Sequence, residues 1–76
     1  MKTREARRLA NRAETIDEMI AAKVEIQRAA RSAATRAFEL RHLGAQCVQQ
    51  RRLEESLYAV ADELSERIEW SYMSSL

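Results

Sequence analysis

The chain has no proline and only one glycine, one cysteine and one tryptophan among its 76 residues. Because proline and glycine are the residues that most disfavour helix interiors, little interrupts the long stretches on either side of Gly44. Alanine, leucine, glutamate, arginine and glutamine, all strong helix formers, dominate both stretches. The sequence therefore predicts an all-α fold, an antiparallel helical hairpin of two long helices joined at Gly44.

Other scarcities exclude further classes of protein. Cys47 is the only cysteine, so an internal disulfide and a cysteine pair for zinc are excluded, as suits a reducing compartment. The longest apolar runs fall far short of the roughly 20 residues of a membrane span, and the first residues are charged rather than apolar. We therefore expect a cytoplasmic protein without a membrane partner. The chain contains 13 lysine and arginine residues and 12 aspartate and glutamate residues, so its net charge is only +1. Any electrostatic role must therefore come from a local cluster of charges.

No grouping of side chains predicts catalysis. His42 and Cys47 are five positions apart across the predicted turn, but a two-helix hairpin offers no water-excluding pocket in which a thiolate could act. The carboxylates from Glu54 to Glu63 lack the histidines of a metal centre and are typical of a solvated face. We expect a protein that is not an enzyme and has no metal, cofactor or small-molecule substrate.

The first predicted helix covers about residues 4–42. Its apolar residues Leu9, Ala13, Ile16 and Ile20 recur at spacings of four, three and four, and later apolar positions drift around the helix. The segment from Thr15 to Glu18 matches a capping box, which would instead end a short first helix of about a dozen residues. We favour one continuous helix, because no glycine or proline interrupts it.

The second predicted helix covers about residues 46–72, after a turn in which Gly44 takes the left-handed conformation that ends a helix. Its seam of apolar residues predicts packing against the first helix within one domain, residues 1–76. The second helix is shorter, so residues 1–12 would project beyond it as an overhang. The predicted packing residues are Ile16, Ile20, Ala30, Ala37, Leu53, Leu57, Val60, Leu64 and Ile68.

Charge is segregated along the chain. Residues 1–12 form a basic arm, residues 28–52 are again basic, and the last third is acidic. The arm is either an ordinary solvated helix face or a surface that follows a phosphate backbone, or else it meets the acidic end of another copy. Its candidate binding residues are Arg4, Arg7, Arg8 and Arg12, to which Arg28 and Arg31 add in the nucleic-acid interpretation.

Aromatic residues gather near the C-terminus. Trp70, Tyr72 and Met73 follow Tyr58 by a few turns, and these residue types dominate many interface energies. We interpret these four residues as a partner-binding site. The alternative is that Trp70 packs internally near Ile16.

Together these patterns predict a non-enzymatic protein–protein interaction module. It would act as a small regulator, inhibitor, co-chaperone or adaptor that binds a larger protein through helix packing, and would complete its core as a homodimer or by docking. The alternative is a dimeric RNA- or DNA-binding regulator that uses a basic helical face.

Overall fold

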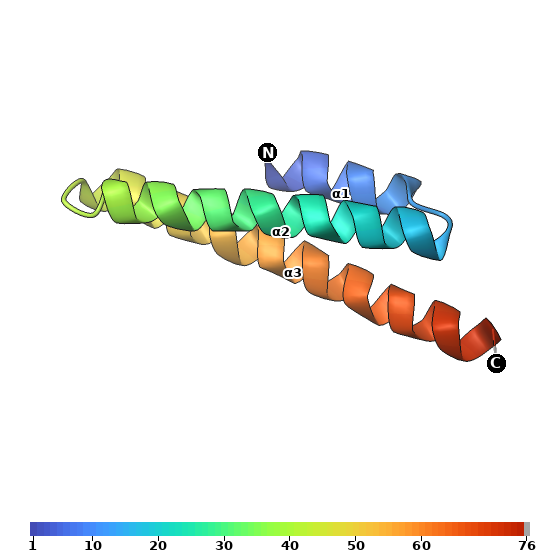
Figure 1. The fold of residues 1–76 in the computed structure, drawn as a ribbon. Helices are drawn as coiled ribbons and strands as arrows, with labels where there is room; N and C mark the ends of the chain where they lie inside the picture. Colours follow the sequence, from blue (N-terminus) through green and yellow to red (C-terminus); the bar gives the residue numbers. More distant parts are fainter. Residues whose placement is uncertain (76) are drawn as a thin grey trace.

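The computed structural model describes residues 1–75 as three helices, α1 (Thr3–Arg12), α2 (Ile16–Glu39) and α3 (Gly44–Ser75), with no strand among these residues. The all-α prediction is confirmed. Helix α3 runs back alongside α2, and α1 lies against both (Figure 1). The molecule measures 50 × 18 × 13 Å. None of the helices in this part of the chain combines the length and apolar character that crossing a membrane requires.

The predicted continuous helix over residues 4–42 is wrong, because the chain breaks between Arg12 and Ile16. The break is held by the capping box: the Glu18 amide donates to Thr15 Oγ1 at 3.1 Å, and the Thr15 amide donates to the Glu18 carboxylate at 3.2 Å. These bonds satisfy amide groups that a helix start leaves unpaired. The chain then reverses, so the predicted overhang is also wrong: α1 folds back, and Ala6 is fully buried.

The predicted role of Gly44 is wrong as well. No described glycine has a positive φ, and Gly44 is the first residue of α3 rather than a left-handed residue closing α2. Helix α2 ends instead where the Arg41 guanidinium donates to the Phe38 carbonyl at 2.9 Å and the Leu43 amide donates to the Leu40 carbonyl at 2.8 Å. The second long helix therefore begins two residues earlier than predicted and extends to Ser75.

The core lies along the line where α2 meets α3, with a smaller part under α1. On α2 the buried positions are mostly alanines, which let the α3 backbone approach closely. Ile26, Leu57, Val60 and Leu64 are the largest fully buried side chains. The buried residues of α2 are Met19, Ala22, Ile26, Ala30, Ala33 and Ala37, and those of α3 are Leu57, Val60, Ala61 and Leu64.

Most predicted packing residues lie in or beside this core, but Ile20 does not. Ala30, Ala37, Leu57, Val60 and Leu64 are buried, and Ile16, Leu53 and Ile68 are half-buried. Ile20 is 39% exposed. Ile20 lies about 100° around α2 from Met19 and about 120° from Ile26, both of which are buried, so it turns away from the buried face.

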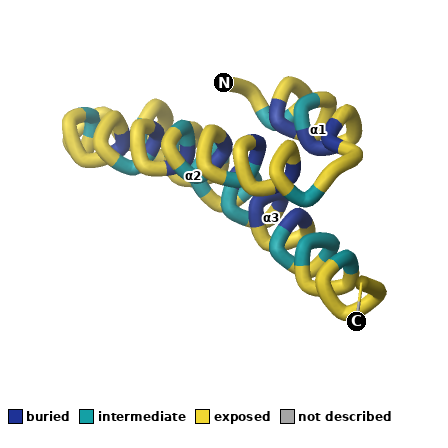
Figure 2. Tube along the Cα trace, turned by 45° about the vertical axis from the view of Figure 1, so that its right-hand side comes forward, coloured by how far each residue is buried: buried dark blue, intermediate teal, exposed yellow. Residues whose placement is uncertain are grey.

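The fold is thin and exposes much of its surface (Figure 2). Its accessible area is 5512 Å², against about 4,800 Å² for a compact monomer of this mass. Its radius of gyration is 14.0 Å, against roughly 11 Å for a compact chain of this length. The extra exposed area follows from the arrangement of the helices, since α1 covers only one side of α2 and α3.

Candidate interaction surfaces

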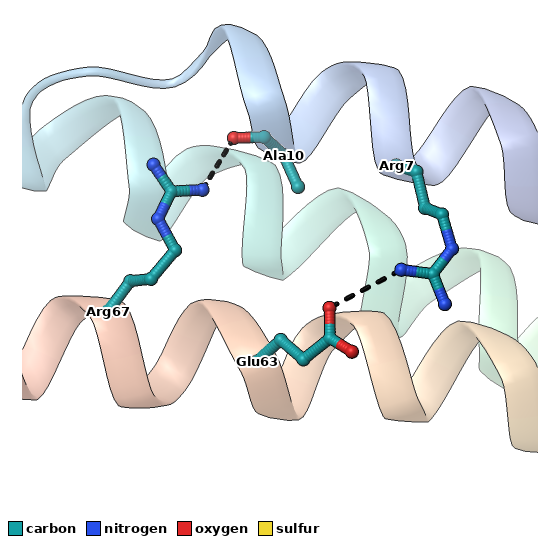
Figure 3. A network of polar contacts seen from close by, with 4 residues as sticks. All are labelled: Arg7, Ala10, Glu63 and Arg67. Carbon is teal, nitrogen blue, oxygen red and sulfur yellow. Dashed lines mark hydrogen bonds and ion pairs between the residues drawn. The ribbon is translucent and has the colours of Figure 1, made fainter.

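Helix α1 is fixed to the rest of the molecule by Arg67 of α3. The guanidinium donates one hydrogen bond to the Ala10 carbonyl at 2.8 Å (Figure 3). It donates another to the Ala13 carbonyl at 2.9 Å. Carbonyls at the end of a helix lack intrahelical partners, and a positive charge there also interacts favourably with the helix dipole. Arg67 therefore closes α1 and sets its orientation on α3.

Sequence reasoning missed this residue, although a signal was present. Arg67 is the only basic residue after Arg52, within an otherwise acidic third of the chain. Arginine is the basic residue best suited to fixed, forked hydrogen bonds, so a single arginine in such a segment indicates a specific acceptor. Which acceptor it finds depends on the fold, because Ala10 precedes it by 57 positions.

A second contact joins the same two helices but is weaker. Arg7 and Glu63 form an ion pair at 3.5 Å (Figure 3), and both side chains are more than half exposed. Water screens such a pair, so it contributes little to stability. It does, however, turn Arg7 toward α3 and away from the other arginines of α1.

The predicted basic arm is thus divided. Arg4, Arg8 and Arg12 are exposed and follow one another at intervals of four, which places them on the outer face of α1. Within residues 1–75 none of these three arginines forms an ion pair. We call them the α1 arginine face; it contains no aromatic side chain.

Two hollows lie beside α1, and both are open to solvent. The first, of about 410 Å³, lies between α1 and α2 and is lined by Leu9, Ala13, Ala21 and Ala22 together with charged residues. The second, of about 490 Å³, is lined by Glu5, Arg8, Asn11 and Arg12. Within the described residues no group of three or more histidine, cysteine or acidic side chains is placed to hold a metal ion. These hollows are surface depressions between helices.

The predicted aromatic site separates into two surfaces. Trp70 is 68% and Met73 63% exposed, and residues three apart share a helix face. Tyr72 lies about 160° around the helix from Trp70, whereas Tyr58 and Tyr72, fourteen residues apart, lie on one face with Ile68. We call Trp70 and Met73 the outer patch. It lies on the end of α3 that extends away from α2 (Figure 1), so Trp70 does not pack on Ile16.

No protein-family model, no curated protein and no solved structure matches the chain. The function is therefore argued from the surfaces themselves, the outer patch and the α1 arginine face.

Proposed function

We propose that the protein is a non-enzymatic protein–protein interaction module, a small regulator, inhibitor, co-chaperone or adaptor that docks on a larger protein through helix packing. The observation that carries the proposal is the exposure of Trp70 beside Met73 on the projecting end of α3. Tryptophan is the residue most enriched among those that dominate interface energies, and burying a large apolar side chain contributes about 1.5–3 kcal/mol. A partner that covers the outer patch gains this energy without requiring the module to refold.

The thin fold supports the same proposal. Helices α2 and α3 act as a hairpin that α1 braces on one side, and pairing or docking completes it to a helical bundle. Within residues 1–75 the largest fully buried side chains are Ile26, Leu57, Val60 and Leu64, and a chain this small commonly needs additional contacts for stability.

The test is recovery of the tagged protein from a nuclease-treated lysate of its native source, followed by mass spectrometry. We expect a protein partner in stoichiometric amount that the Trp70→Ala variant no longer recovers. The matched control is Phe38→Ala, which removes another exposed aromatic at the opposite end of the molecule, and it should retain the partner. Equal recovery by the Trp70→Ala variant would contradict the assignment of the outer patch.

A second candidate function is the binding of RNA or DNA, because the α1 arginine face presents three aligned positive charges without acidic partners in the described chain. Arginines on successive turns neutralise phosphates and release counterions, which makes affinity salt-dependent. If this face binds nucleic acid, changing Arg4, Arg8 and Arg12 to glutamine should reduce the slope of log K against log salt by about one per residue. Trp70→Ala should then leave nucleic-acid affinity unchanged.

A further inference from the structure

Helix α1 covers one side of the pair formed by α2 and α3 and leaves the opposite side open. On α2, Glu18, Ala22 and Glu25 line the hollow beneath α1. On α3, Glu63 and Arg67 make the polar contacts to α1. These residues define the covered side of both helices, and the positions half a turn away define the other side.

The open side carries apolar residues among polar ones on each helix. On α3, Tyr58, Ser65 and Tyr72 lie on this side at seven-residue intervals, and Ile68 lies beside Tyr72. Tyr58 and Ile68 are half-buried against the core, and Tyr72 is 54% exposed. On α2 the apolar residues of this side are Ile16, Ile20 and Ala34, and Gln27 and Arg31 lie between Ile20 and Ala34 on the same face. We call this surface the uncovered groove, lined by Ile16, Ile20, Ala34, Tyr58, Ile68 and Tyr72.

Charge differs between the two ends of the α2 and α3 pair. Near the turn, residues 28–52 contain six arginines and one acidic residue. At the other end, residues 13–25 and 53–75 contain ten acidic residues against one lysine and one arginine, and that arginine is bonded to α1. Two copies packed in the same direction would bring like charges together, whereas two antiparallel copies place the basic end of each beside the acidic end of the other.

We propose that a second copy of this chain packs antiparallel on the uncovered groove, related to the first by a two-fold axis. The molecule is 50 Å long, and a stable interface buries about 800 Å² of each partner, so the second copy must lie along most of this length. This inference goes beyond the proposed function and does not depend on it, because Trp70 lies about 120° around α3 from Tyr58.

One pair of residues reports directly on the antiparallel arrangement. Arg51 precedes Tyr58 by one seven-residue repeat and therefore lies at the edge of the groove near the turn. Glu69 lies eighteen residues after Arg51, which is five helical turns, so the two residues share a face but are about 27 Å apart. Within one chain they cannot meet, and Arg51 pairs there with Glu54 at 3.0 Å. In the antiparallel dimer Arg51 of each copy comes beside Glu69 of the other, twice.

The experiment is sedimentation equilibrium of the full chain and of charge-exchange variants over a wide range of concentrations. The wild-type protein should reach twice the 8.8 kDa mass of one chain. Arg51→Glu and Glu69→Arg should each raise the dimer dissociation constant roughly tenfold, because each variant places like charges together at two contacts. The variant with both changes should recover most of the wild-type affinity.

The matched control makes the same charge change on another side of α3. Arg52 is exposed and lies about 100° around the helix from Arg51, so Arg52→Glu should leave the dissociation constant within about twofold of wild type. Circular dichroism of every variant checks that the helices are intact. A wild-type chain that stays monomeric, a double variant without recovery, or a control variant as weak as Arg51→Glu would each overturn the proposal. The Trp70→Ala variant should form the dimer with the wild-type dissociation constant. Its loss of a protein partner would then test the proposed function alone.

Discussion

Replacing Arg67 by methionine should release α1 from the other two helices. Methionine retains an unbranched apolar side chain but removes both hydrogen bonds to the carbonyls of Ala10 and Ala13, at 2.8 and 2.9 Å. Hydrogen bonds from charged groups contribute about 1.5–3 kcal/mol each when well buried. Arg67 is only half-buried, so we expect the two bonds together to contribute about 2 kcal/mol.

The loss should be local, because α1 adds few other polar contacts to the described part of the molecule. Amide hydrogen exchange measures it directly: 2 kcal/mol corresponds to about thirtyfold faster exchange of the α1 amides. The amides around Ile26 and Leu57, in the centres of α2 and α3, should exchange as in the wild type. Arg67→Lys should give an intermediate result, because one ammonium group cannot fork to two carbonyls.

Arg52→Met is the matched control, since Arg52 is an exposed arginine on the same helix. It should leave exchange unchanged throughout the chain. Unaltered protection of α1 in Arg67→Met, or an equal loss in all three helices, would refute the assigned role of Arg67.

Further predictions concern stability and self-association. Thr15→Ala removes the capping hydroxyl at the start of α2 and should lower the free energy of unfolding by about 1 kcal/mol, measured by urea denaturation. Gly44→Ala should raise it by about 0.5–1 kcal/mol, because Gly44 is helical and an added Cβ meets no atom within 4 Å; a clear destabilisation would contradict the helical assignment. Leu57→Ala, at a fully buried position, should cost about 3 kcal/mol, while Leu43→Ala in the exposed turn should change stability by less than about 0.5 kcal/mol. Added salt should weaken the proposed dimer, since it screens the complementary charges of the two ends.

The helical class was predictable from the sequence because it depends on summed local propensity, and three helices are what residues 1–75 show. The capping box at Thr15 is visible in the sequence, but whether the helix breaks there depends on a balance between two free-energy terms. Continuing the helix retains local hydrogen bonds, whereas breaking it lets Ala6 and Ala10 pack on the other helices. That packing energy depends on residues far apart in the chain and cannot be obtained from the local sequence.

The surfaces were predictable to different degrees. Spacing alone separates Trp70 from Tyr72, since residues two apart lie on opposite sides of a helix. The pairing of Arg67 with Ala10 and Ala13 depends on two segments more than fifty residues apart and required the fold. The prediction for Gly44 is wrong because α2 already ends at Glu39, where the Arg41 side chain donates to the Phe38 carbonyl, and Gly44 begins α3 without a positive φ.

The mass of the assembly that the tagged protein forms in a nuclease-treated lysate of its native source tests the central proposal most directly. If the protein is a module that docks on a larger partner, its native mass should exceed that of the 8.8 kDa chain, alone or paired with itself, by the mass of that partner. The same measurement on Trp70→Ala should return only the mass of the chain alone or paired with itself. An assembly of wild-type protein no larger than such a pair, or one that nuclease removes, would contradict the account.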